Sequence, residues 1–268
     1  MPEGPECRST IDYLNKNLQG KLVNEWVFCG GKFPDNYPDG FVEFNNALPL
    51  RLNQVNCKGK FIYFIFIDEK DNDKEYYILH SLMMTGRWQK SYNDYAKWFL
   101  ETGKGKTMWF CDPRSFATIK FTSDREVLEQ KLDSLGPDIM SREFSLDKFK
   151  EIIKKYNKRN ITAFMMDQEV ISGCGNYLKA EILYYAKISP MRKVSNLNKR
   201  EIEILYEGLK IIPRLSYNMW GSTIKKCLDE DGTCHYDIKE LKIYGKKHAK
   251  RTKTADGRIT YWDPKYQE

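Results

Sequence analysis

The chain has 268 residues, of which 41% are hydrophobic, so it can form one large domain or two modest ones with apolar cores. Its mean hydropathy is −0.64, and no stretch approaches the ~20 apolar residues of a membrane span, so we expect no membrane association. Glu3 and Glu6 stand where a secretory signal would carry basic and then apolar residues, which favours an intracellular, soluble protein.

The net charge of +7 is spread unevenly along the chain. Residues 1–137 hold 18 Lys and Arg against 19 Asp and Glu, whereas residues 138–268 hold 26 against 18. A basic second half is typical of polyanion binding, because neutralised phosphates release their counterions. A lysine-rich solvated surface explains the charge equally well.

The seven cysteines are odd in number and scattered, and none forms a C-x-x-C pair. Cys227, Cys234 and His235 lie close together in the sequence, but no fourth ligand completes them at a usual zinc spacing. We therefore expect reduced, packed thiols and no metal site.

The first half of the sequence predicts one helix followed by β structure. Residues 5–18 carry apolar side chains at helical spacing, with Gly20 as a stop. The run KFIYFIFID (60–68) suits a buried strand, and YYILHSLMM, TMWFC and ATIKF follow in similar style. Short strands separated by turn-rich segments predict a sandwich or a barrel.

The composition changes near the sequence LGPD, and we place a domain boundary at about 134–140. The segment SLDKFKEIIKKY then predicts a helix with Ser145 as its N-cap. Further helices are predicted for ITAFMMDQ, NYLKAEILYYAKI and NKREIEILYEGLKII, the last with Asn198 and Glu201 in capping-box spacing. The second part of the chain is therefore expected to be helical.

The final segment, residues 241–268, predicts a basic β-hairpin. KHAKRTKT and RITYW flank Asp256-Gly257, and glycine tolerates the positive φ that such a turn requires. A basic hairpin with Tyr and Trp suits an arm that contacts DNA. Because an isolated ribbon is only marginally stable, we expect it to pack on the helices.

Pro2 and Glu3 are candidates for covalent chemistry. Removal of Met1 would expose the secondary amine of Pro2, and an α-amino group loses its proton far more readily than a lysine side chain. Attack on the anomeric carbon of a deoxynucleotide would expel the base and leave a Schiff base, from which strand cleavage by elimination can follow. Glu3 could protonate the sugar ring oxygen or shuttle protons. By itself, MPEGPE is equally the ordinary start of a helix.

MPEGPE resembles the start of the formamidopyrimidine-DNA glycosylase/endonuclease VIII family, and further motifs recur in that family's order. These are KGKF (58–61), LMMTG (82–86), DPRSF (112–116), LGPD (135–138), MDQEVISGCGNYLKAEILYYAKISP (166–190) and GRITYWDPKYQ (257–267). The resemblance covers nearly the whole chain and implies an α+β multi-domain fold. The expected parts are an N-terminal β-sandwich with an N-terminal helix (1–133), a helical helix-two-turn-helix domain (134–220) and a zincless finger β-hairpin (221–268).

The resemblance assigns Pro2 as the nucleophile and Glu3 as the acid/base residue, with Glu6 as a weaker catalytic or structural candidate. Lys60 matches a lysine that contacts phosphate near the lesion. A lysine kept in water at a strand edge would also account for that position.

The resemblance also assigns residues that hold DNA. Asn176 matches an asparagine that grips phosphate beside a helix N-terminus, and Arg258 matches a finger arginine that clamps the phosphates flanking the lesion. Met84, Arg114 and Phe116 match the three residues that replace an extruded base in the duplex. Without the family context, GCGN is a helix–turn–helix joint, Arg258 is one more cation of a basic hairpin, and Met84 is a core residue.

The sequence departs from the family pattern at informative places. Asp263 and Tyr266 stand where members with a zinc finger have cysteines, which predicts a zincless finger and no metal. Thr162 stands where many relatives have a lysine that contacts DNA.

The resemblance implies a base-excision-repair DNA glycosylase with AP lyase activity by β,δ-elimination, which removes oxidised bases and needs no cofactor. Its partner would be damaged double-stranded DNA, bound by a monomer wherever that DNA lies (nucleus, nucleoid or viral replication site). MPEGPE with Gly4 and the zincless arm favour oxidised pyrimidines and formamidopyrimidines, whereas the void-filling trio and GSTIKKCLDEDG (221–232) favour 8-oxoguanine. A non-catalytic damaged-DNA-binding scaffold and an unrelated helical nucleic-acid module are the alternatives.

Overall fold

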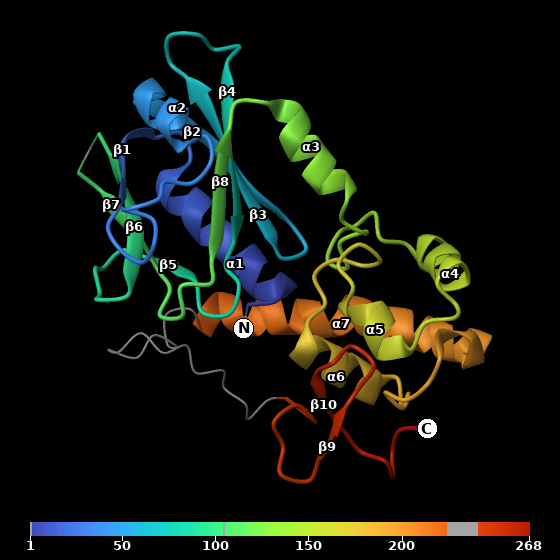
Figure 1. Cartoon of the computed structure of the whole chain (residues 1–268). Helices are drawn as coiled ribbons and strands as arrows, with labels where there is room; N and C mark the ends of the chain where they lie inside the picture. Colours follow the sequence, from blue (N-terminus) through green and yellow to red (C-terminus); the bar gives the residue numbers. More distant parts are fainter. Residues whose placement is uncertain (1, 104, 224–240) are drawn as a thin grey trace. The chain divides into compact units, whose positions relative to one another are not determined.

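The computed structural model describes residues 2–103, 105–223 and 241–268, and they divide into two compact units (Figure 1). The first comprises the chain up to Pro2 together with Glu6–Ser134, and the second comprises Glu3–Pro5 and Leu135–Glu268. Each unit contains its own cluster of buried apolar side chains. No helix in the described part of the chain is long and apolar enough to cross a membrane.

The first unit is built on one antiparallel sheet. Among the described residues this sheet has eight strands in the order β5-β7-β6-β1-β2-β3-β4-β8. The strands are β1 (Leu22–Phe28), β2 (Leu50–Lys58), β3 (Phe61–Asp68), β4 (Glu75–Ser81), β5 (Arg87–Gln89), β6 (Ala96–Thr102), β7 (Thr107–Cys111) and β8 (Thr118–Thr122). The helices are α1 (Gly4–Leu18), α2 (Phe41–Ala47) and α3 (Arg125–Asp133).

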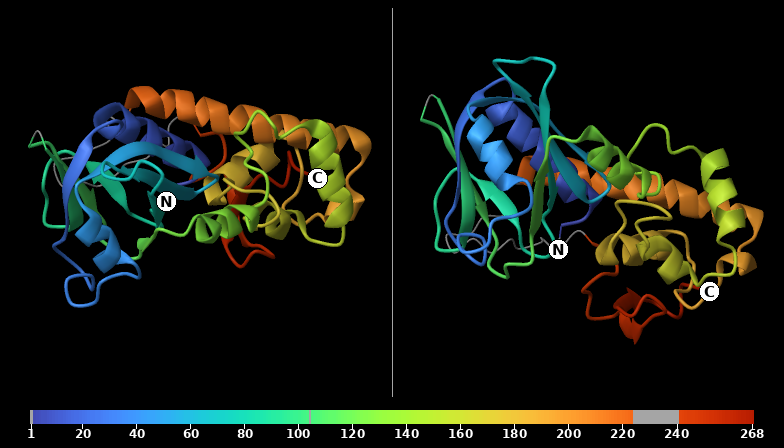
Figure 2. Two further views of the ribbon diagram at one scale, coloured as in Figure 1. Left: turned by 90° about the horizontal axis from the view of Figure 1, so that it is seen from above. Right: turned by 45° about the horizontal axis from the view of Figure 1, so that its top comes forward.

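The sheet curls over an aromatic core. Trp26 of β1 is buried, and its ring centroid lies 5.6 Å from that of Phe121 in β8 and 5.9 Å from that of Trp88 in β5. β1 and β8 are separated by three strands in the sheet order, so these contacts require the sheet to fold back on itself as two layers. Side chains of α1 and α2 belong to the same core, and the ribbons of both helices lie beside the strands of the sheet (Figure 2). The predicted β-sandwich with an N-terminal helix is confirmed.

The second unit is helical, as predicted. Its elements are α4 (Leu146–Lys155), α5 (Ile161–Met166), α6 (Asn176–Tyr185), a short 3-10 helix η1 (Val194–Asn196), α7 (Lys199–Thr223) and the strands β9 (Lys250–Lys253) and β10 (Ile259–Trp262). The Ser145 hydroxyl accepts the backbone N–H of Lys148 at 3.3 Å and so caps α4. Asn198 and Glu201 exchange two hydrogen bonds of 2.8 and 3.0 Å before α7, which confirms the capping box.

α6 is the central helix of this unit. Its residues from Tyr177 to Leu183 are all buried, including the charged Lys179 and Glu181. β9 and β10 pair as an antiparallel hairpin that packs on α6, and Gly257 in the turn has a φ of +76°. The predicted hairpin is therefore present. Cys227, Cys234 and His235, and GSTIKKCLDEDG from residue 224 onward, lie outside the described residues.

Candidate active site

Glu3 is held at the N-terminus of α6, within the second unit. Its side chain is 1% exposed, and its two carboxylate oxygens accept the backbone N–H groups of Tyr177 at 3.0 Å and Leu178 at 3.2 Å. The first-turn amides of a helix have no partner within the helix, and the helix dipole favours a negative charge beside them. The backbone N–H of Gly4 also donates to the carbonyl of Gly173 at 2.9 Å. These bonds fix both the position and the direction of the Glu3 carboxylate.

Gly175 makes room for that carboxylate. Its φ of −136° and ψ of −161° are extended values that any residue can adopt, so backbone conformation does not require glycine here. A Cβ atom added at Gly175 would lie 2.1 Å from Cδ of Glu3 and 2.3 Å from Oε1. The GCGN sequence therefore requires a glycine at this position because of the space that Glu3 occupies.

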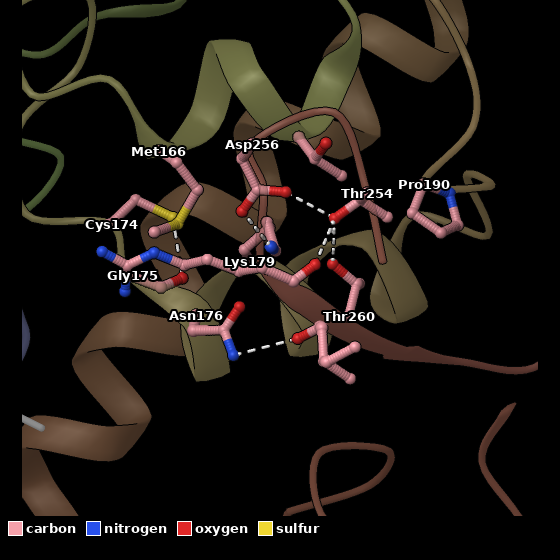
Figure 3. A network of polar contacts seen from close by, with 12 residues as sticks. Met166, Cys174, Gly175, Asn176, Lys179, Pro190, Thr254, Asp256 and Thr260 are labelled. Carbon is pink, nitrogen blue, oxygen red and sulfur yellow. Dashed lines mark hydrogen bonds and ion pairs between the residues drawn. The ribbon is translucent and has the colours of Figure 1, made fainter. Parts of the chain in front are cut away.

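Asn176 and Arg258 lie near the same helix end. The side-chain amide of Asn176 donates to the carbonyl of Ile259 at 3.1 Å, which joins the start of α6 to the hairpin residue that follows the exposed Arg258 (Figure 3). The ring centroid of Tyr244 lies 6.3 Å from that of Tyr177, in the first turn of α6. Burial raises the pKa of the Tyr244 phenol, and the charges of Glu3 and Arg258 shift that pKa in opposite directions. The second unit thus brings three predicted site residues together around a tyrosine that the sequence analysis did not single out.

Pro2, Glu6 and Lys60 belong to the first unit. Pro2 is half-buried and lies two residues before the start of α1, while Glu6 lies in the first turn of that helix. Lys60 is half-buried in the two-residue turn between β2 and β3, where Gly59 supplies a φ of +59°. The thiol of Cys7 in α1 lies 3.6 Å from the carbonyl oxygen of Lys60. The predicted phosphate-contacting turn is therefore attached to the beginning of α1.

Met84, Arg114 and Phe116 lie on two loops of the first unit. Met84 is half-buried in the turn after β4, and Arg114 and Phe116 are exposed between β7 and β8, with 49% of Phe116 accessible. The Arg114 guanidinium lies 4.9 Å from the centre of the Phe116 ring, which is within the range of a cation–π contact. A large exposed aromatic side chain paired with an arginine is difficult to explain as core packing.

A buried carboxylate ties these two loops together. Asp112 is fully buried, and its Oδ2 accepts the backbone N–H of Ala117 at 2.8 Å. Its Oδ1 accepts the hydroxyl of Thr85, on the loop of Met84, and lies 3.3 Å from the backbone nitrogen of Arg114. The sequence analysis did not assign a role to Asp112, although it is the first residue of the DPRSF motif. Its position identifies it as the residue that joins the two loops.

His80 belongs to the core beneath these loops. Its Nδ1 lies 2.9 Å from the carbonyl oxygen of Thr118, and its Nε2 lies 3.4 Å from the indole nitrogen of Trp88. A neutral ring satisfies both contacts by donating from Nδ1 and accepting at Nε2. Burial lowers the pKa of His80 from 6.5 to about 4, so the ring is neutral at physiological pH.

The described residues contain no group of three or more His, Cys, Asp or Glu side chains that could hold a metal ion.

Thr162, at the position where relatives have a lysine that contacts DNA, is fully buried. Its hydroxyl donates to Oδ1 of Asn160 at 2.6 Å, at the start of α5. This side chain therefore has a local structural partner and no access to an external ligand.

Models of two protein domains match the chain. The formamidopyrimidine-DNA glycosylase N-terminal domain matches residues 1–119, and the formamidopyrimidine-DNA glycosylase H2TH domain matches residues 135–227. A formamidopyrimidine-DNA glycosylase of Legionella pneumophila is 28% identical over 261 residues, which cover 92% of this chain and 89% of the relative. The Zymomonas mobilis protein of the same name is 26% identical over 272 residues, which cover 97% of each chain.

Solved structures share the fold. The MutM (Fpg) protein of Thermus thermophilus aligns with a TM-score of 0.81 at 24% identity, covering 99% of this chain and 98% of that one. The Lactococcus lactis Fpg, solved as a complex with DNA containing an abasic site, aligns with a TM-score of 0.81 at 22% identity over 99% of each chain. The two domain models match successive parts of the chain, and the relatives align along nearly its whole length. The chain therefore belongs to the formamidopyrimidine-DNA glycosylase/endonuclease VIII family.

Proposed function

We propose that this DNA glycosylase of base excision repair removes oxidised bases from damaged duplex DNA through a Schiff base on Pro2, and then cleaves the strand as an AP lyase. The relatives named above are formamidopyrimidine-DNA glycosylases. The observation that carries the proposal for this chain is the buried Glu3 carboxylate, held at the start of α6 directly after Pro2. The enzyme needs no cofactor, because the nucleophile is its own terminal amine and the acid/base group is its own side chain. It acts as a monomer.

The reaction begins with the unprotonated amine of Pro2. Its nitrogen forms a bond to the anomeric carbon while the bond from that carbon to the base breaks, and the departing base takes up the proton that the Pro2 nitrogen loses. Glu3 protonates the sugar ring oxygen or shuttles protons, and ring opening leaves the Schiff base. This cation acidifies the neighbouring sugar protons, so successive loss of the two flanking phosphates completes β,δ-elimination. The two backbone partners of Glu3 keep its carboxylate in one orientation during these steps.

The proposed DNA contacts come from residues of both units. Lys60, Asn176 and Arg258 bind phosphates, and Met84, Arg114 and Phe116 fill the space left by the flipped base. The exposure of Arg114 and Phe116 supports this assignment, because both side chains are available to a ligand. For Met84, which is half-buried, the support is its position on the loop that Asp112 joins to the other two.

The proposed substrates are oxidised pyrimidines and formamidopyrimidines. Two features favour them: the motif MPEGPE, and the finger sequence YWDPKYQ, which carries no cysteine. The complete trio of void-filling residues favours 8-oxoguanine instead. Duplexes that each carry one defined lesion test the ranking by the rate of base release. Thymine glycol should be excised efficiently, and release of 8-oxoguanine without any activity on thymine glycol would reverse the ranking.

Borohydride trapping tests the nucleophile and the lyase step together. Wild-type protein should form a covalent adduct with a duplex carrying thymine glycol or an abasic site, and peptide mass mapping should place that adduct on the N-terminal residue. Protein with a blocked N-terminus should form none, and Pro2→Gly, which supplies only a primary amine, should form less. A Lys60→Gln variant controls for trapping on that lysine: the adduct should still form on the N-terminal residue, with a lower yield because a phosphate contact is lost. If Met1-processed wild-type protein binds the duplex without forming an adduct, the chain is a damage-recognition scaffold instead.

A further inference from the structure

A buried ion pair links α6 to the turn of the hairpin. Lys179 Nζ lies 2.6 Å from Oδ2 of Asp256, and the two side chains are 0% and 3% exposed (Figure 3). Burial lowers the pKa of Lys179, and Asp256 opposes that shift. Removing one member of such a pair leaves the other as a buried, uncompensated charge. Because Lys179 has no access to solvent, it cannot contact a phosphate itself.

The pair is joined by hydrogen bonds to the turn that precedes and includes Arg258. Asp256 accepts the Thr254 hydroxyl with its other oxygen, so the carboxylate bridges α6 and the first residue of the turn. Thr254 in turn donates its backbone N–H to the carbonyl of Arg258 at 2.9 Å, and its own carbonyl accepts the N–H of Gly257 at 2.8 Å. The charge of Lys179 is therefore connected, through Asp256 and Thr254, to the main chain of Arg258.

The same helix also fixes the segment that leads into the hairpin. Glu181 is 5% exposed, and its carboxylate accepts three successive backbone N–H groups. The donors are Lys242 at 2.9 Å, Ile243 at 2.9 Å and Tyr244 at 2.7 Å. Together with the bond from Asn176 to Ile259, these contacts attach the finger to α6 at its entry, its turn and its return strand.

We propose that Lys179 is a positioning residue for Arg258: through Asp256 it holds the turn of residues 254–258 on α6 and so directs the Arg258 guanidinium toward a DNA phosphate. This inference rests on the phosphate-binding role of Arg258 in the proposed function. A group that fixes a phosphate-binding arginine contributes to DNA affinity without contacting DNA.

The salt dependence of binding distinguishes this role from a merely structural one. Each phosphate that a protein neutralises adds about 0.9 to the slope of log affinity against log salt on B-DNA. Arg258→Gln should lower the slope by about one such contact. Lys179→Met should lower it by the same amount although Lys179 is buried, and the double variant should show no further loss. Lys148→Met removes an exposed lysine of α4 in the same unit and should leave the slope unchanged.

The measurement is fluorescence anisotropy of the full chain with a duplex that carries a tetrahydrofuran abasic-site analogue, between about 50 and 200 mM salt. Thermal unfolding confirms that each variant is folded. Asp256→Asn keeps the shape of the turn residue and removes its charge, so it provides the test if Lys179→Met does not fold. It should lower the slope as Arg258→Gln does.

The outcomes separate this inference from the proposed function. If Arg258→Gln lowers the slope but folded Lys179→Met and Asp256→Asn do not, Lys179 is not a positioning residue, and the role of Arg258 stands. Additive losses from Lys179→Met and Arg258→Gln would overturn the inference in the same way. If Arg258→Gln leaves the slope unchanged, the phosphate role of Arg258 is wrong, and the positioning role of Lys179 falls with it.

Discussion

The most direct test of the Glu3 assignment is Gly175→Ala, because the new methyl group would occupy the place of the carboxylate. The added Cβ would lie 2.1 Å from Cδ of Glu3 and 2.5 Å from Oε2. Non-bonded carbon atoms are in contact at about 3.5–4.0 Å, so the carboxyl group must move by roughly 1.4 Å or more. The extended backbone at Gly175 is open to alanine, so the change acts on Glu3 without imposing backbone strain.

A misplacement of about 1 Å can cost a catalytic group about 100-fold in rate. We therefore expect Gly175→Ala to reduce single-turnover release of thymine glycol by about that factor. Affinity for a duplex with an abasic-site analogue should change little, since Asn176 and Arg258 keep their side chains. Glu3→Gln should lose at least as much rate. Gly103→Ala should retain the wild-type rate, because the three atoms nearest to its Cβ belong to the flexible Asn24 side chain and lie at 3.3 Å or more.

Wild-type base release by Gly175→Ala, with a large loss in Glu3→Gln, would show that the position of the carboxylate is not set by its contacts at α6. Wild-type rates in both variants would remove Glu3 from the acid/base role. A loss of DNA affinity equal to the loss of rate would show that Gly175→Ala disturbs the phosphate contacts instead.

Three further predictions concern the stability of each unit. Asp112→Asn should lower the free energy of unfolding by about 1–3 kcal/mol, because the single amide oxygen cannot accept both the Ala117 N–H and the Thr85 hydroxyl. Urea denaturation measures this loss, and an unchanged midpoint would contradict the role of the carboxylate. His80 has a folded pKa of about 4 against 6.5, so between these values only the unfolded chain binds the proton, and stability falls as the pH drops. The His80 contribution should lower the free energy of unfolding by about 2 kcal/mol between pH 7.5 and pH 5, and His80→Asn should lack that part of the pH dependence. Asn198→Ala removes the side chain that accepts the backbone N–H of Glu201 and should lower the free energy of unfolding by about 1 kcal/mol in the same urea assay. This variant should release bases at the wild-type rate.

The elements that the sequence predicts well depend on local signals. The apolar spacing in residues 5–18, the cap at Ser145 and the capping box at Asn198 each involve neighbours within a few residues, and all three are confirmed. The Asp256-Gly257 turn is local in the same sense, because the positive φ of one glycine closes the hairpin. The strands of the first unit are predicted by long aromatic and β-branched runs, because the side chains on one face of the sheet are buried in the core.

The polar contacts that position the site could not be predicted in this way. Lys179 and Asp256 are 77 residues apart, and Glu3 and Tyr177 are 174 residues apart, so no local pattern pairs them. Lysine is almost never fully buried, so from the sequence NYLKAEIL one predicts that Lys179 is exposed to solvent. Every residue of α6 from Tyr177 to Leu183 is buried, which removes the apolar periodicity that would have marked an inner face. The motif resemblance located Asn176 and Arg258 but gave no indication of what holds them.

The assignment of Glu3–Pro5 to the second unit has a consequence for how that unit can be produced in isolation. A fragment that begins at Leu135 would contain all its helices but would leave the amides of Tyr177 and Leu178 without the carboxylate that accepts them. A short synthetic peptide carrying the first residues of the chain supplies that acceptor. Fragment complementation with such a peptide would therefore convert a tertiary contact of the intact protein into a binding equilibrium that calorimetry can measure.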